Sequence, residues 1–251
     1  MEFLAEVQSA AFWTGLLTII WVNIILSGDN AVVIALAARS LPPHQQGKAV
    51  AWGAGAAVVM RIILTIVAVE LLKWPYLKII GGLLLFWIAV SLLLPEDGGD
   101  DVESSDNLFQ AIKTILIADL VMSLDNVIAV AAAAKGSIAL LVIGLAISIP
   151  LVIFGATILM KLMERYPIIV TAGAGILGWV AGEMLVTDPS LVDWIKVNAA
   201  WLHIHTPIGE ISWAQVAGVI LVIGLGKWLA SRKEAGEEKV VDLAANDQQN
   251  R

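Results

Sequence analysis

Two short segments carry hydroxyl, carboxylate and amide side chains in the same order. Ser27-Gly-Asp29-Asn30 (motif 1) aligns without gaps on Ser123-Leu-Asp125-Asn126 (motif 2), and in this register Asn23 falls on Asp119. Oxygen ligands of these kinds suit hard divalent cations such as Mg²⁺, Ca²⁺ and Mn²⁺. Gly28 is a poor helix former and predicts a local break in motif 1, whereas Leu124 at the matching place makes a break less expected.

Both motifs lie inside long apolar segments, where charge is costly. The chain has 251 residues, of which 59% are hydrophobic and 15% charged, with a mean hydropathy of +0.86; a soluble domain averages roughly 25% charged residues. An aspartate at the centre of a membrane helix costs about 2.5 to 3.5 kcal/mol on insertion scales. Three such residues, Asp29, Asp119 and Asp125, therefore favour a functional site over a structural network.

Two further ionisable residues lie within apolar segments. We interpret Arg61 as the counter-charge of one aspartate when the site is empty. Glu183, near the end of its segment, is interpreted as taking part in ion passage, with snorkelling to the interface as the alternative. The predicted metal ligands are Asn23, Asp29, Asn30, Asp119, Asp125, Asn126 and Glu183, with Ser27, Ser123 and Arg61 as accessory residues. We interpret His203 and His205 as surface residues of a loop, with an accessory ion contact as the alternative.

Seven apolar segments predict an all-α fold, a polytopic transmembrane helical bundle of seven spans. Most approach the roughly twenty helical residues that cross a hydrocarbon core of about 30 Å. A unit with three spans must be inverted when it is repeated, so we expect two inverted three-helix repeats plus one extra helix. The segments are residues 12–38, 49–72, 77–94, 108–134, 137–160, 168–186 and 212–230.

The same segments divide the chain. The predicted parts are 1–94, the first repeat; 95–107, an acidic flexible linker; 108–186, the second, inverted repeat; 187–210, an outer loop with a surface helix; 211–230, the seventh span; and 231–251, a disordered cytoplasmic tail. Lysine and arginine are in excess on one set of flanks. This excess predicts that the N-terminus lies outside and the C-terminus lies in the cytoplasm, and our overall interpretation is a multi-pass protein of a bacterial inner membrane.

Composition excludes several chemistries. The chain has no cysteine, which rules out disulfides, thiolate metal sites and thiol nucleophiles. It has neither a basic patch with interleaved aromatics nor a phosphate-binding glycine loop, so nucleic-acid binding and ATP-driven pumping are not favoured. We expect no enzymatic activity and no resident cofactor.

The paired motifs, together with Gly182-Glu183-Met184, resemble the TerC family of integral membrane proteins over roughly residues 10 to 230. The match is to its manganese-exporter-like branch, which is grouped with a lysine-exporter-like superfamily of inverted-repeat transporters. The resemblance implies manganese efflux and metal homeostasis, and it implies that the acidic and amide positions of the motifs form the metal site.

We therefore expect a secondary transporter in the lipid bilayer that exports a divalent metal cation, with manganese as the expected cargo. Two alternatives stay open. One is a Ca²⁺ or broader cation/proton antiporter. The other is a metal-binding membrane scaffold or sensor, linked to tellurite or metal stress, that transports nothing. Assembly into a homo-oligomer is compatible with each.

Overall fold

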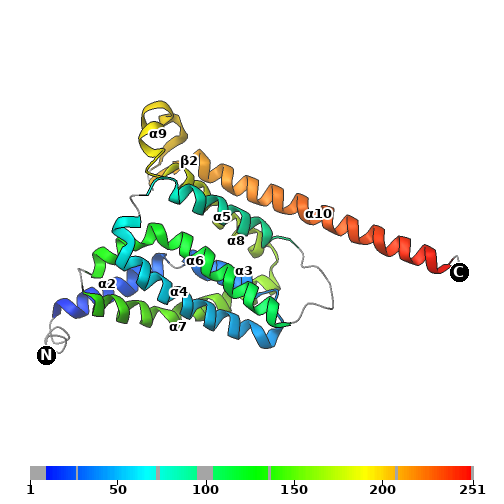
Figure 1. Cartoon of the computed structure of the whole chain (residues 1–251), viewed down its shortest axis with the longest axis horizontal. Coiled ribbons are helices and arrows are strands. Elements are labelled where there is room, and N and C mark those ends of the chain that lie inside the picture. Colours follow the sequence, from blue (N-terminus) through cyan, green and yellow to red (C-terminus); the bar gives the residue numbers. More distant parts are fainter. Residues whose placement is uncertain are drawn as a thin grey trace.

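The structure, a computed structural model, is described here for residues 10–26, 28–71, 74–94, 104–134, 137–206 and 209–249. These residues are almost entirely helical, as Figure 1 shows, in agreement with the predicted all-α fold. The helices are α2 (Ala10–Leu26), α3 (Gly28–Ala38), α4 (Pro43–Leu71), α5 (Leu77–Ser91), α6 (Ser104–Ala134), α7 (Ile138–Arg165), α8 (Ile168–Val186), α9 (Val192–Asn198) and α10 (Trp213–Gln249). A 3₁₀ turn η1 (Ala200–Leu202) and an antiparallel hairpin of β1 (His203–Thr206) and β2 (Gly209–Ser212) connect α9 to α10.

Five of the described helices, α4, α6, α7, α8 and α10, are long and apolar enough to cross a membrane. A sixth span results if α2 and α3, which meet at a bend of 50°, are counted together. The segment predicted as the third span, 77–94, contains α5, which has 15 residues and is shorter than a full crossing needs. The chain is therefore a multi-pass membrane protein.

The break between α2 and α3 lies at motif 1, where Gly28 predicts it. The first helical residues of α3 are Gly28 and Asp29, and the Asp29 carboxylate accepts a hydrogen bond of 2.8 Å from the Asn30 backbone N–H. A side chain that takes a backbone N–H at a helix start competes with continuation of the preceding helix. Motif 2, with Leu124 in place of the glycine, lies inside the uninterrupted helix α6.

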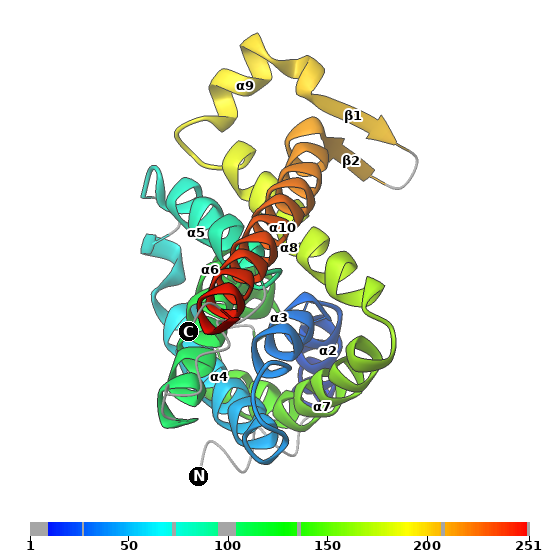
Figure 2. The same ribbon diagram turned by 90° about the vertical axis from the view of Figure 1, so that its right-hand side faces the viewer.

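Helix α3 forms the centre of the bundle. Every residue from Asn30 to Ala38 is buried, and α3 contacts α4, α6, α7 and α8, which surround it in Figure 2. Large apolar side chains such as Trp21, Trp52 and Phe154 instead point outward and are exposed. Soluble monomers rarely carry such extensive apolar surface, so the outside of the bundle fits a lipid environment.

The chain after α8 differs in part from the prediction. Helix α9 lies within the predicted surface-helix segment, but the hairpin of β1 and β2 was not anticipated. Helix α10 continues to Gln249, through residues predicted to form a disordered tail; that stretch is rich in glutamate, lysine and alanine, which are strong helix formers. Residues 95–103 of the predicted linker lie outside the described residues, and 104–107 belong to α6.

The end of α8 holds the start of α5. The Asp188 carboxylate accepts hydrogen bonds from the backbone N–H groups of Tyr76 (3.0 Å) and Lys78 (3.1 Å), which lie at the N-terminus of α5. Tyr76 has a left-handed backbone with φ of 67°, a conformation that costs a non-glycine residue about 1 to 2 kcal/mol. Asp188 therefore caps α5 from more than a hundred residues away in sequence.

Asp188 also has a shifted pKa. Burial would raise the pKa, but hydrogen bonds from the Ser190 hydroxyl and N–H and from the Tyr76 and Ile79 N–H groups outweigh burial, so the pKa lies below its ordinary value. These bonds stabilise the folded state above the unfolded-state pKa of about 3.9. The stabilisation is lost as the pH falls through the lower folded-state pKa.

Glycines let α8 and α10 approach closely. A Cβ atom on Gly178 would lie 2.6 Å from the Gly218 carbonyl oxygen, and one on Gly218 would overlap the Gly178 carbonyl oxygen. Gly182 faces Ala214 in the same way. Small residues four positions apart on each helix, Gly178 and Gly182 on α8 and Ala214 and Gly218 on α10, allow this backbone contact.

We expect Gly218→Ala to destabilise the protein by about 1 to 3 kcal/mol, because the added methyl group forces α10 away from α8. Gly224→Ala on the same helix is the control, since a Cβ there meets no described atom within 4 Å. Thermal unfolding in detergent measures both variants. Equal midpoints for the two variants would contradict the close contact.

We expect Asp188→Asn to lower the unfolding midpoint at neutral pH and to remove part of its acid dependence. The wild-type advantage should shrink as the pH falls below about 4, where the Asp188 carboxylate becomes protonated in the unfolded chain and then in the folded one. Unfolding midpoints measured across this range test the sign. Asp193→Asn is the matched control, because Asp193 is exposed and 3.9 Å from Lys196.

Candidate functional site

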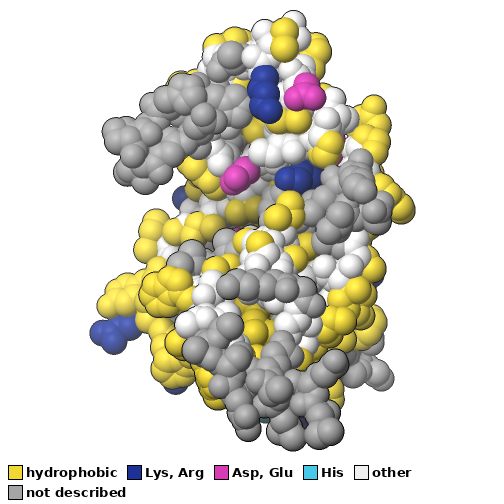
Figure 3. Space-filling model, turned by 90° about the vertical axis from the view of Figure 1, so that its left-hand side faces the viewer, with side chains coloured by type: hydrophobic (Ala, Val, Ile, Leu, Met, Phe, Trp, Pro, Cys, Tyr) yellow, Lys and Arg dark blue, Asp and Glu magenta, His cyan; other side chains and the backbone are white. Residues whose placement is uncertain are grey.

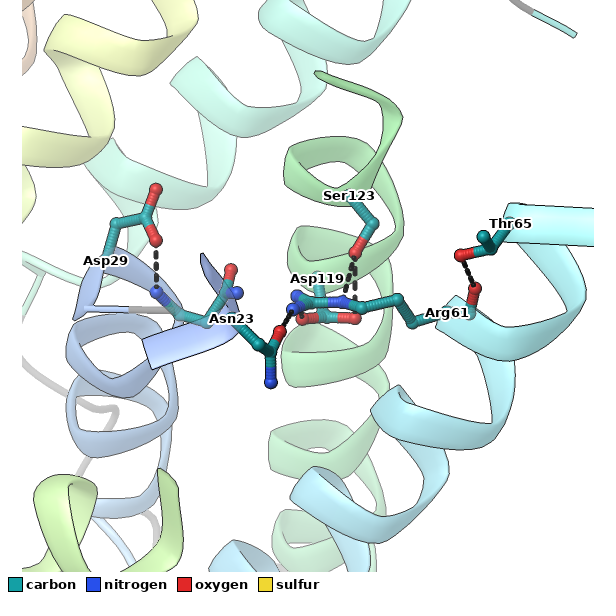
Figure 4. Close-up of polar contacts among 7 residues, drawn as sticks. Asn23, Asp29, Arg61, Thr65, Asp119 and Ser123 are labelled. Atoms are coloured by element: carbon teal, nitrogen blue, oxygen red, sulfur yellow. Dashed lines mark hydrogen bonds and ion pairs between the residues drawn. The ribbon is translucent and has the colours of Figure 1, made fainter. Parts of the chain in front are cut away.

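Arg61 is the centre of a buried polar cluster, shown in Figure 4. It lies on α4, and its side chain donates to three oxygens from two other helices. Nη2 contacts Oδ1 of Asp119 at 2.6 Å, Nη1 contacts Oδ1 of Asn23 at 2.8 Å, and Nε contacts Oγ of Ser123 at 3.0 Å. The cluster joins α2, α4 and α6.

The cluster is shielded from solvent and internally bonded. The relative exposures of Arg61, Asp119, Asn23 and Ser123 are 3%, 6%, 1% and 0%. Ser123 donates to the second oxygen of Asp119 at 3.2 Å. A carboxylate and a guanidinium in a low-dielectric interior each need such partners, because isolated buried charges are costly. The Arg61–Asp119 ion pair is therefore neutral as a unit and held by neutral hydrogen bonds.

Asn23 and Asp119 occupy matching positions in the alignment of motif 1 with motif 2. Their alignment predicts equivalent places, and both side chains accept from the same guanidinium. Thr65, one turn after Arg61 on α4, donates to the Arg61 carbonyl oxygen at 2.7 Å. The sequence analysis did not single out Thr65, although a polar residue four positions from a charge inside an apolar segment is a usable signal.

Asp29 and Asn30 form the second part of the site, at the start of α3. Asp29 is half-buried, and Figure 4 shows its carboxylate bonded to the Asn30 N–H. Asn30 is 3% exposed, and among the described residues neither its amide oxygen nor its amide nitrogen has a hydrogen-bond partner. Buried amides of this kind are rare, because a buried polar group is normally hydrogen-bonded.

The remaining predicted site residues either lie outside the cluster or are described only in part. Ser27 and the side chain of Asp125 lie outside the described residues, and Asn126 is half-buried on α6. Glu183 is exposed near the end of α8, and its carboxylate accepts a hydrogen bond of 3.0 Å from Gln215 of α10. Glu183 lies on α8, whereas the hydrogen bonds described for the Arg61 cluster join α2, α4 and α6. His203 and His205 lie in β1, and their side chains are not described.

Gln215 is a further polar residue that the sequence analysis missed. It is buried, and besides donating to Glu183 it accepts from the Ser212 N–H at 2.6 Å, so it caps the start of α10. A glutamine three residues after a serine at a helix start is a capping pattern that the sequence contains.

The possible metal ligands of the interior site are carboxylate and amide oxygens. Among the described residues, no group of three histidine, cysteine, aspartate or glutamate side chains stands ready to hold a metal ion. The oxygens of Asn23, Asp29, Asn30 and Asp119 are hard ligands, but Asp119 and Asn23 are engaged by Arg61. A cation that binds Oδ1 of Asp119 or Oδ1 of Asn23 would compete with the Arg61 guanidinium for these oxygens.

Comparison with known proteins places the chain in a family. The model of the integral membrane protein TerC family matches residues 8–235, which is most of the chain. The chain belongs to the TerC family. No solved structure matches it.

TerC relatives include membrane proteins of Bacillus subtilis (strain 168). The chain is 46% identical to YjbE over 176 residues, which cover 70% of this chain and 81% of YjbE. It is 25% identical to YkoY over 257 residues, or 94% of this chain and 76% of YkoY. It is also 30% identical to the inner membrane protein YoaE of Escherichia coli (strain K12) over 152 residues, which are only 28% of YoaE. The names of these three proteins give no substrate.

We expect Arg61→Met to destabilise the protein by about 3 to 5 kcal/mol, because it leaves Asp119 buried without its cationic partner. Adding Asp119→Leu removes that uncompensated charge and should recover much of the loss. Reversible unfolding of the two single variants and the double variant forms a double-mutant cycle. Additive effects of the two substitutions would contradict the coupling.

Proposed function

We propose that the chain is a secondary transporter that exports a divalent metal cation, with Mn²⁺ as its cargo. The observation that carries this proposal is the buried cluster of Arg61, Asp119 and Asn23 next to Asp29 and the unpartnered Asn30. Ionisable residues at membrane depth are expensive and mark ion pathways. Membership of the TerC family supports a role in membrane transport.

In the proposed mechanism, Arg61 forms an ion pair with the Asp119 carboxylate when no cation is bound. An arriving divalent cation binds the side-chain oxygens of Asp119 and Asn23, and the Arg61 side chain withdraws or rotates away. The cation then replaces the guanidinium as the positive partner of Asp119. Asp29 and the Asn30 amide oxygen complete the ligand set from α3, which begins at a helix break beside the cluster. Broken helices are where secondary transporters commonly form their midplane sites. By the sequence alignment, Asp125 and Asn126 add ligands from motif 2.

The choice of Mn²⁺ rests on ligand chemistry and on the resemblance of the motifs. Carboxylate and amide oxygens without thiolate favour Mg²⁺, Ca²⁺ or Mn²⁺ over Zn²⁺ or Cu²⁺. The resemblance to manganese-exporting members of the family then favours manganese. A Ca²⁺ or broader cation/proton antiporter uses the same ligands and is separated by metal competition.

Helix packing supports the proposed inverted repeat. Gly53 of α4 faces Ile115 of α6, and Gly144 of α7 faces Ile19 of α2. Ile19 and Ile115 each lie four residues before the matched positions 23 and 119. Helix α4 packs on α6 as α7 packs on α2, and α5 packs on its counterpart α8. These matched contacts are the pattern expected when two related three-helix units pack about a pseudo-two-fold axis.

The proposed topology has seven crossings, with α2 and α3 as the first and the short α5 as the third. The start of α5 is tied to the end of α8 by Asp188, so both lie at one membrane face. With an even number of crossings between them, α5 and α8 then run in opposite directions, as an inverted repeat requires. The lysine and arginine distribution supports a cytoplasmic C-terminus in the bacterial inner membrane.

We expect Asp119→Asn and Asp29→Asn each to reduce Mn²⁺ flux at least about tenfold, because a cation loses a charged ligand worth more than about 1.4 kcal/mol in the transport step. Flux is measured in proteoliposomes with and without a pH gradient, and with competing Ca²⁺. Asp193→Asn, an exposed carboxylate outside the cluster, is the control and should transport normally.

Each alternative has its own outcome. Wild-type flux in both cluster variants contradicts the assignment of the site. Equal flux of Ca²⁺ and Mn²⁺ identifies the broader antiporter. Metal binding by the wild type without flux of any cation identifies the scaffold or sensor and ends the transport proposal.

A further inference from the structure

Helix α9 and the η1 turn present three different flanks. The first is apolar and packed: Ile195 and Ala199 are buried against Val186 of α8, with Leu191, Leu202 and Ala214 alongside them. This flank fixes α9 to the ends of α8 and α10, so α9 has a defined place and is not a loose loop.

The second flank is apolar and exposed. Trp194, Val197 and Trp201 have relative exposures of 60%, 81% and 72%. Trp194 and Val197, three residues apart, lie on one side of α9, and Trp201 follows in the η1 turn. Three large apolar groups side by side in water are unfavourable, at about 25 cal/mol for each Å² of apolar surface. This flank therefore calls for a covering partner.

The third flank is charged. Asp193 and Lys196 are exposed at their side chains and lie 3.9 Å apart. They lie beside the exposed apolar flank on the same short helix. Packed, apolar and charged flanks on one helix match a position where protein, lipid and water meet.

Connectivity places α9 at the level where a bilayer ends. Only residues 187–191 separate it from α8, which crosses the membrane. Exposed aromatic residues mark the same end of the bundle: Trp74 and Tyr76 precede α5, which Asp188 ties to the end of α8, and Trp213 begins α10. Tryptophan and tyrosine are enriched at the headgroup level of membranes. Figure 3, which views the molecule from this side, shows patches of hydrophobic side chains among white polar and backbone atoms, with few charged side chains.

We infer that α9 is a membrane-surface anchor whose Trp194–Val197–Trp201 flank inserts into the headgroup layer of the bilayer at the end of α8. The occupant is the lipid interface itself. Asp193 and Lys196 face the water, and the buried flank transmits the anchoring to the ends of α8 and α10. This inference does not depend on which cation is transported or on whether transport occurs.

Spin labels on single cysteines test the inference, since the natural chain has no cysteine to remove. Val197→Cys reports on the exposed apolar flank and Lys196→Cys, its sequence neighbour, on the charged flank. Both full-length variants are reconstituted in vesicles of phosphatidylethanolamine and phosphatidylglycerol. Collision with oxygen, which concentrates in the hydrocarbon, and with a water-soluble nickel chelate is then measured for each label.

The inference requires that the ratio of oxygen to nickel collisions be several-fold higher at position 197 than at position 196. A water-like ratio at both positions overturns it. Shielding of the label at 197 from both reagents also overturns it, because that outcome means contact with a second copy or another protein. Both positions are strongly exposed, so the labels leave the packed flank intact.

A second pair of variants checks the direction. In the Val197→Cys background, replacing Trp194 and Trp201 by serine should move the label toward water and lower the ratio several-fold. Replacing Asp193 by serine in the same background should leave the ratio unchanged or raise it. An unchanged ratio after loss of both tryptophans contradicts the anchoring.

Discussion

The interior of the bundle is organised by one guanidinium that has to be satisfied away from water. Arg61 can donate five hydrogen bonds in a fixed planar fork. Three of these bonds reach oxygens on two neighbouring helices. The oxygens come from Asn23 of α2 and from Asp119 and Ser123 of α6, while α4 carries the arginine itself. Since each unpaired polar group in a membrane interior costs several kcal/mol, the relative position of these helices is closely constrained.

Close helix packing makes that arrangement geometrically accessible. Gly53 against Ile115 and Gly144 against Ile19 bring α4 to α6 and α7 to α2, and a Cβ at either glycine would lie within 2.7 Å of the isoleucine. Without a hydrophobic driving force between helices in lipid, such van der Waals contact is a main source of association energy. Helix α3, made largely of alanine and valine, packs against these helices and is buried from Asn30 to Ala38.

Features that depend on residues close together in the sequence could be predicted, whereas contacts between residues far apart in the sequence could not. The apolar segments, the break at Gly28 and the equivalence of Asn23 with Asp119 follow from residue type and spacing. The sequence places Arg61 among aspartates, but only the packing of α4 on α6 selects Asp119 as the one that pairs with it. The cap from Asp188 to Tyr76 and the bond from Gln215 to Glu183 join residues 112 and 32 positions apart, and no periodicity reveals such contacts.

The two halves of the site differ in a way that matters for how it can change state. On one side Arg61 and Ser123 each contact one oxygen of Asp119, whereas on the other the Asn30 amide is buried with no hydrogen-bond partner among the described residues. A buried amide without partners carries a free-energy cost of about 1 to 3 kcal/mol. Any state that supplies Asn30 with a ligand or donor is stabilised relative to this one by a similar amount. A ligand shifts a conformational equilibrium only through such a difference in interaction between states, and α3, which begins at a helix break, is the element on which that difference acts.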